Sequence, residues 1–166
     1  MSRGDARITL LLQVLDQGFA AKGWQGATLR GAVRGLTHRQ ALWRPGTGRH
    51  NVWELVLHTA YWKHLVRQRV GGGGGAREAF PRGPRNFPRL PERCDAAAWR
   101  ADVALLERQH RRLVAVVRDL PPSRLGARVG KSRWVVAEQI FGIAAHDLYH
   151  TGQIQLLKAL QRERSG

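Results

Sequence analysis

The chain has 166 residues, of which 43% are hydrophobic and 24% charged, and its formal net charge is +16. This length supports a single domain, residues 1–166, with its own apolar core, and the composition argues against intrinsic disorder. No apolar run reaches the ~20 residues of a membrane-spanning helix, and no signal peptide is recognisable. A single cysteine excludes an intramolecular disulfide, so we expect a cytoplasmic protein without membrane association.

The positive charge raises the question of nucleic-acid binding. Arginines occur in every segment of the chain, and only four of the basic residues are lysines. Dispersed positive charge predicts non-specific, salt-sensitive attraction to polyanions, and not a defined nucleic-acid site. We therefore do not expect nucleic acid to be a specific partner.

The first part of the chain has a helical pattern. Asp5 is a candidate N-cap for a helix whose apolar positions keep the helical period: Ile8, Leu11, Leu12, Leu15 and Phe19. A shorter helical segment follows at Leu29–Leu36. Thr37 and Gln40 then form a possible capping box for one more turn, which Pro45 ends.

A second long helix is predicted after Asn51, which can cap it, with Glu54 placed to return the capping bond. Its inward stripe is Leu55, His58, Trp62 and Leu65, and the glycines at 71–75 stop it. Residues 71–93 are rich in glycine and proline and form a long connection. We expect its glycine end to be mobile and the segment Phe80–Pro91 to lie against the body of the protein.

Two further helices follow the connection. Asp95 is the candidate cap of the third, which Pro121 and Pro122 end. The fourth is expected from about Ser132 to about Arg162. Its two internal glycines would allow a neighbouring helix to come close: Gly142 and Gly152. Four amphipathic helices without a strand pattern predict an all-α fold, a four-helix bundle whose long crossover joins helices two and three.

Three histidines are the candidate site. His146 and His150 are four residues apart, so both rings lie on one face of the last helix, and His58 is on the inward stripe of the second. Three imidazoles from two helices can bind one divalent metal and leave a coordination position open, as in catalytic sites. Zinc or nickel suits such ligands better than magnesium or calcium. Hydrogen-bonded core histidines are the alternative.

Four other residues are candidates for lining the pocket or for hydrogen bonding to the ligands. Trp62 is one turn after His58, Gln153 is close to His150, and Glu54 and His110 are on helices that carry or face the site. Ordinary core packing explains Trp62 equally well, and a hydrogen bond on the helix face explains Gln153 equally well. His110 could hydrogen-bond a ligand or be a fourth ligand, and Glu54 suits the helix cap better. No general base can be assigned from the sequence.

The segments HNVWELVLHTAYW and EQIFGIAAHDLYHTGQIQLLK, with GWQGATLRGAVRGLTHRQALWRP before them, resemble the DinB/YfiT-like family. The resemblance implies a four-helix bundle, often a homodimer, in which His58, His146 and His150 bind a divalent metal. It also implies either a metal-dependent hydrolase acting on a small molecule or a thiol S-transferase or isomerase that uses a low-molecular-weight thiol. A non-catalytic basic bundle, either a stress protein or a nucleic-acid-binding protein, is the alternative from another class.

The aromatic content adds to the expectation of a homodimer. Five tryptophans besides Trp62 are most simply core anchors: Trp24, Trp43, Trp53, Trp99 and Trp134. With apolar residues off the main stripes, such as Val135, Val136 and Phe141, they exceed what one small bundle readily buries. A partner chain or the connection at 71–93 would cover the excess.

Overall fold

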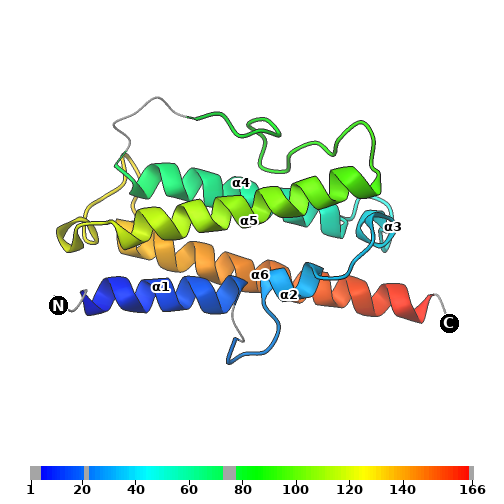
Figure 1. Ribbon diagram of the computed structural model, residues 1–166, viewed down its shortest axis with the longest axis horizontal. Coiled ribbons are helices and arrows are strands. Elements are labelled where there is room, and N and C mark those ends of the chain that lie inside the picture. Colours follow the sequence, from blue (N-terminus) through cyan, green and yellow to red (C-terminus); the bar gives the residue numbers. More distant parts are fainter. Residues whose placement is uncertain (1–4, 21–22, 73–77, 165–166) are drawn as a thin grey trace.

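The computed structural model describes residues 5–20, 23–72 and 78–164, and within these ranges the chain is helical without a β-strand (Figure 1). The elements are α1 (Ala6–Phe19), α2 (Leu29–Val33), α3 (His38–Leu42), α4 (Val52–Val70), α5 (Ala96–Arg118), the 3₁₀ turn η1 (Pro122–Arg124) and α6 (Val136–Glu163). The predicted all-α class is confirmed.

The predicted helix caps are present. The Asp5 side chain accepts a hydrogen bond from the Arg7 backbone N–H at 2.9 Å, and α1 begins at the next residue. Asn51 and Glu54 form a reciprocal capping box at the start of α4. Asp95 accepts from the Ala98 N–H at the start of α5. Each cap satisfies a donor that the helix itself leaves unpaired, so local sequence fixes these starts.

The last helix begins at Val136, four residues later than the sequence suggested. Before it, the Ser132 hydroxyl oxygen accepts the Trp134 N–H, and the Glu138 carboxylate accepts the Val135 N–H at 2.8 Å. These side chains therefore accept hydrogen bonds from backbone N–H groups between residues 132 and 135, so this segment does not need to be helical to satisfy them. A bridge between Arg128 and Val135 further holds the segment extended.

The long helices pack against one another. α4 packs against α5 and α6, and α1 packs against α6 and α5 (Figure 1). The core has two apolar clusters, one around Trp53, Leu57 and Leu106 and the other around Leu113 and Ile140. Between them along the helices lie buried polar residues: His58, Thr59, Lys63, His110, Asp147, His150 and Thr151. The candidate site belongs to this polar layer.

The described part of the connection between α4 and α5 that follows the uncertain residues, 78–95, runs along the outside of these helices in Figure 1. Phe80 is buried in the core, and Phe87 and Leu90 pack against it, so the expected contact of Phe80–Pro91 with the body is confirmed. Gly71 caps the end of α4. The expectation of a mobile glycine end falls largely on residues 73–77, outside the described residues.

The prediction for the two glycines of the last helix was wrong for this chain. A Cβ at Gly142 or Gly152 would meet nothing within 4 Å, and both glycines are exposed. Gly18 of α1 instead permits a close helix contact, because a Cβ there would lie 3.1 Å from the Ala144 carbonyl oxygen of α6. Helical period alone did not distinguish a buried glycine from an exposed one.

The tryptophans divide between core and surface. Trp53 and Trp99 are buried and meet edge to face, with ring centroids 5.2 Å apart, and Trp43 is half-buried. Trp24 is 95% exposed and Trp134 48% exposed, so the expectation that these two anchor the core was wrong. Trp24 lies after the end of α1 and Trp134 lies before the start of α6, so neither is on the inward face of a helix.

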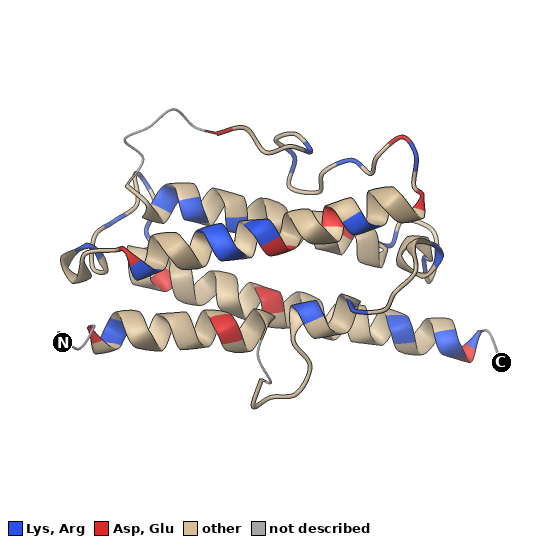
Figure 2. Ribbon diagram, viewed as in Figure 1, with Lys and Arg blue, Asp and Glu red and all other residues tan. Residues whose placement is uncertain are grey.

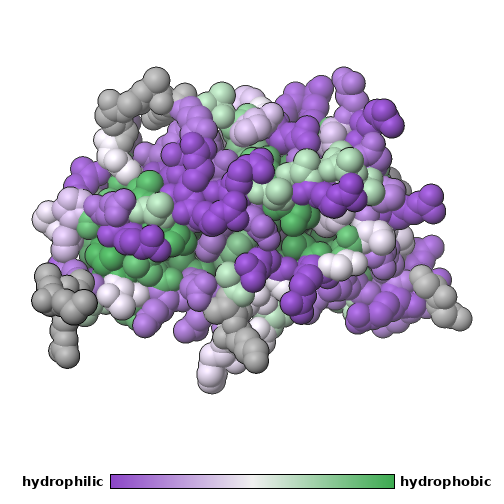
Figure 3. Space-filling view, in the orientation of Figure 1, coloured by the Kyte–Doolittle hydropathy of each residue, from purple (hydrophilic) through white to green (hydrophobic). Residues whose placement is uncertain are grey.

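Neither the positive charge nor the exposed apolar surface is confined to one part of the molecule. Figure 2 shows lysines and arginines on every long helix and on the connection, without a single continuous stripe on this face. Figure 3 shows hydrophilic side chains over most of the same face and apolar side chains gathered in two areas. Among the helices described, none combines the length and apolar character that crossing a membrane demands.

Candidate metal centre

The three candidate histidines come together between α4 and α6. His58 Nε2 lies 3.0 Å from His146 Nε2, which lies 3.1 Å from His150 Nε2. His58 and His150 are buried, and His146 is half-buried. In the described part of the chain this is the group of potential metal ligands whose donor atoms all lie within 4.8 Å of one another. The i, i+4 spacing therefore places two rings beside a third from another helix.

Hydrogen bonds orient two of the rings. His58 Nδ1 is 2.7 Å from the backbone carbonyl of Asn86, which can only accept, so Nδ1 carries the proton. His150 Nδ1 is 2.7 Å from Gln153 Oε1, and this amide oxygen, which also can only accept, requires the same tautomer. Both Nε2 atoms then present lone pairs toward His146. The Nδ1 of His146 is buried without a hydrogen-bond partner among the described residues, so no neighbour fixes the tautomer of this ring. With the His146 proton on Nδ1, three Nε2 lone pairs would be available to a cation.

The spacing suits a small divalent ion. Nitrogens that bind a tetrahedral zinc at about 2.0–2.1 Å stand about 3.3 Å apart, close to the two separations observed here. The set contains three neutral nitrogens and no carboxylate or thiolate. Borderline ions such as zinc and nickel prefer this chemistry, whereas magnesium and calcium prefer oxygen.

The electrostatics keep the rings neutral. Burial lowers the pKa of His58 to about 4 and that of His146 to about 3, and it also lowers the pKa of His150. A histidine must be neutral to bind a metal. All three rings are therefore ready to act as ligands near neutral pH, where protons compete weakly for their nitrogens.

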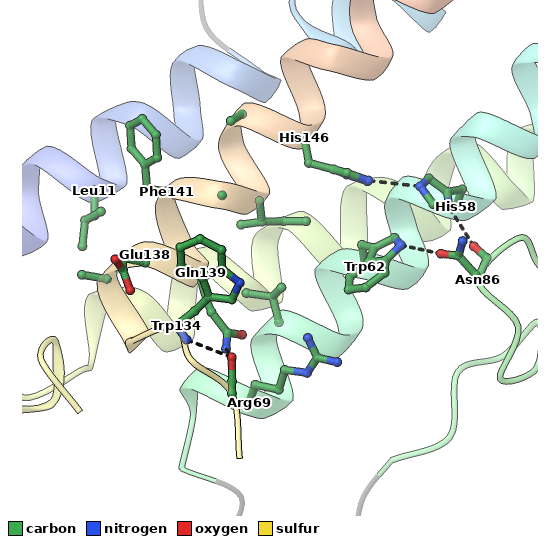
Figure 4. A pocket seen from close by; sticks show the side chains of 16 residues that line it. Leu11, His58, Trp62, Arg69, Asn86, Trp134, Glu138, Gln139, Phe141 and His146 are labelled. Atoms are coloured by element: carbon green, nitrogen blue, oxygen red, sulfur yellow. Dashed lines mark hydrogen bonds between the residues drawn. The ribbon is translucent and has the colours of Figure 1, made fainter. Parts of the chain in front are cut away.

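The connection supports the α4 side of the site (Figure 4). Asn86 accepts from His58 through its backbone carbonyl and from Trp62 Nε1 through its side-chain oxygen, at 2.7 Å in each case. Phe87 stacks on the His58 ring with centroids 4.2 Å apart. Nothing in the position of Asn86 in the sequence pointed to these bonds. A residue 28 positions from His58 thus helps to fix its ring.

The other residues singled out in the sequence lie in different places. Trp62 has its ring centroid 6.4 Å from His58, and Gln153 bonds His150 directly. Glu54 is occupied by the helix cap and by Arg44, at 2.6 Å. His110 stacks on Phe19 and lies 3.3 Å from Lys63 Nζ, and it is not part of the three-histidine cluster.

Behind the site is a buried ion pair that the sequence did not reveal. Lys63 of α4 donates to the Asp147 carboxylate of α6, and neither side chain is exposed. Burial lowers the pKa of Lys63 and raises that of Asp147, and each charge opposes the shift of the other. Because Asp147 follows His146 directly, this pair ties the ligand-bearing helix to α4.

A pocket of about 1040 Å³ opens beside the site (Figure 4). His58 and His146 form part of its wall, together with aromatic side chains from α6 and the segment before it and from α4: Trp62, Trp134 and Phe141. Its charged lining residues are Arg69 and Glu138. The size and apolar lining are typical of pockets for small organic molecules.

Comparison of the chain with known proteins identifies one matching family. The family model described as the DinB superfamily matches residues 23–154, a range that contains all three histidines. No curated protein and no solved structure gives a significant match to the chain.

Proposed function

The chain belongs to the DinB superfamily, and on that premise we propose that His58, His146 and His150 bind one divalent metal ion in a hydrolase acting on a small molecule. The observation that carries the proposal is the convergence of three Nε2 atoms, with separations of 3.0 and 3.1 Å for two pairs. Zinc or nickel is the proposed ion, since all three donors are imidazoles.

His58, His146 and His150 would hold the metal, which would supply Lewis acidity and lower the pKa of a bound water. The protein residues provide the rest. Asn86 and Gln153 orient the rings of His58 and His150. The apolar pocket excludes water from the substrate and places it beside His58 and His146.

The test is hydrolysis of a panel of small esters, amides and lactones by the protein as purified, after chelation, and after return of zinc or nickel. The proposal expects turnover that chelation abolishes and metal restores, and that His146→Ala lacks. His38→Ala is the matched control, because His38 lies in α3 and outside the three-histidine cluster. Turnover that survives chelation and His146→Ala would contradict a metal-dependent hydrolase.

A thiol S-transferase or isomerase is the second candidate, because an open metal position can equally hold a thiolate from a low-molecular-weight thiol. No side chain among the described pocket residues is an evident base for water: the Glu138 carboxylate accepts the Val135 N–H, and both histidines face the site. Turnover of an electrophilic substrate only when a small thiol is added would favour this candidate over hydrolysis.

A non-catalytic bundle that binds nucleic acid is the third candidate, motivated by the net charge of +16. The scattered arginines in Figure 2 favour non-specific attraction instead. DNA binding compared at about 50 and 200 mM salt separates the two. Sequence-dependent affinity that persists at the higher salt would support the third candidate.

We also propose that the protein is a homodimer. One side of α6 exposes large apolar side chains, with Phe141, Tyr149 and Leu156 each about 60% exposed. Val136, which had suggested a second apolar face, is buried within the chain.

Sedimentation equilibrium near physiological salt tests the dimer. Leu156→Glu should give a monomer, whereas Ala101→Glu, at an exposed position of α5, should not. Only an 18.6 kDa species for the unaltered protein would contradict the proposal.

The remaining proposals concern architecture and location. We propose that residues 1–166 form one domain, a four-helix bundle in which residues 71–93 make the crossover between α4 and α5. The two core clusters, which share α4, α5 and α6, support a single unit. We propose a cytoplasmic location because the one cysteine suits a reducing compartment.

A further inference from the structure

Arg69 is the cationic residue of the pocket wall and has no carboxylate partner among the described residues. The ion pairs of the described chain engage seven other arginines, including its neighbour Arg67. Its guanidinium lies over the Trp62 ring, 5.6 Å from the centroid. Trp62 is itself held by Asn86 at 2.7 Å. The positive charge is therefore positioned at the pocket by a fixed ring.

The other charge in the lining does not cancel it. Glu138 caps α6 through the Val135 N–H and lies toward α1, while Arg69 lies on the α4 side, with Trp134 and Gln139 between them in Figure 4. The α4 side of the pocket thus has a net positive charge beside an apolar interior.

Arg69 is also within reach of the candidate metal centre. The Trp62 ring centroid is 6.1 Å from that of His146 and 5.6 Å from the Arg69 guanidinium carbon. The guanidinium is therefore at most about 12 Å from the His146 ring, roughly the length of three or four extended residues. One small molecule can span this distance.

We propose that the pocket binds a small organic anion whose apolar body lies against Trp62, Trp134 and Phe141 and whose anionic end pairs with Arg69. The opposite end of the molecule then lies beside His58 and His146. Such an anion would be the substrate class of the proposed enzyme. Binding of the anion does not depend on the proposed hydrolase activity, but its role as a substrate does. A guanidinium binds a carboxylate through two parallel hydrogen bonds, and the aromatic walls favour an aryl or alicyclic body.

The test is binding of 4-phenylbutyrate and of its neutral amide, 4-phenylbutanamide, by calorimetry to the protein with and without metal. We expect the unaltered protein to prefer the carboxylate in both states, and Arg69→Gln to weaken carboxylate binding about five- to tenfold while leaving amide binding unchanged. Arg133→Gln is the matched control. It removes the same charge from an arginine that lies over Trp134, 4.3 Å from its centroid, but does not line the pocket.

Two results would overturn the inference. Equal loss of carboxylate affinity in Arg69→Gln and Arg133→Gln would mean that net charge alone attracts the anion. Carboxylate binding that requires metal and is unaffected by Arg69→Gln would mean that the carboxylate goes to the metal, which would leave the proposed metal centre standing. Failure of the metal centre itself would appear separately, as absence of bound metal in a protein that still binds 4-phenylbutyrate through Arg69.

Discussion

Replacing Lys63 by methionine should be among the most destabilising single changes in this protein. Lys63 and Asp147 are both fully buried; Lys63 donates to Asp147 Oδ2, and Asp147 Oδ1 has no hydrogen-bond partner among the described residues. Methionine keeps the length of the side chain but leaves the Asp147 carboxylate as an unpaired buried charge. Breaking a buried pair in this way costs about 3–5 kcal/mol of unfolding free energy.

Urea denaturation of the metal-free protein, followed by circular dichroism at neutral pH, measures the effect. With a slope of about 2 kcal/mol per molar urea, Lys63→Met should lower the midpoint by about 1.5–2.5 M. Arg112→Met is the control, because Arg112 pairs with Glu78 at 2.7 Å on the surface and such pairs contribute at most about 1 kcal/mol.

The double variant Lys63→Met with Asp147→Leu separates an unpaired charge from lost packing. Replacing both partners of a buried pair by apolar residues is often neutral, so most of the stability should return. A residual loss of about 1 kcal/mol is expected, because His110 Nδ1 loses the Lys63 ammonium at 3.3 Å. If Lys63→Met costs no more than Arg112→Met, the pair is not buried as described and the reasoning fails.

Three further predictions concern the candidate metal centre. Gln153→Leu removes the acceptor 2.7 Å from His150 Nδ1 and should weaken metal binding about 10- to 100-fold in competition with a chromophoric chelator; unchanged affinity would refute its orienting role. Chelation should lower the thermal midpoint, since metal at about 100 times its Kd adds about 2.7 kcal/mol to stability, and an unchanged midpoint would argue against a site in the folded protein. The metal-free protein should lose stability as pH falls below 6.5. Burial lowers the pKa of His58 to about 4 and that of His146 to about 3 in the folded protein, so below pH 6.5 the unfolded chain binds protons that the folded chain does not. Urea midpoints at about pH 7.5 and 5.5 measure this loss, and equal midpoints would contradict it.

Local sequence patterns predicted most of the helical architecture. Caps such as Asn51 and Asp95 depend on side chains within three residues of the helix start, so their effect can be read from the sequence. The spacing of His146 and His150 likewise fixes their relative position on one helix. The start of α6 could not be predicted, because Ser132 and Glu138 bond the backbone before it in a way that helical period does not reveal.

Contacts between distant segments could not be predicted from the sequence alone. The pairing of Lys63 with Asp147 and the bonds of Asn86 depend on how α4, α6 and the connection are placed in register. The same holds for exposure: Trp24 and Trp53 are the same residue type, yet one lies on the surface and the other in the core. The composition gives the number of aromatic residues, but tertiary packing determines which of them are buried.

The central claim is that three histidines hold one metal ion, and cobalt substitution tests it most directly. Titration of the metal-free protein with Co²⁺ should give visible absorption bands of a low-coordinate cobalt site that saturate at one equivalent per chain. The single alanine variants at His58, His146 and His150 should each lose these bands while keeping their helical content, and His38→Ala should keep them. A stoichiometric cobalt spectrum in the variant that lacks all three histidines would contradict the account.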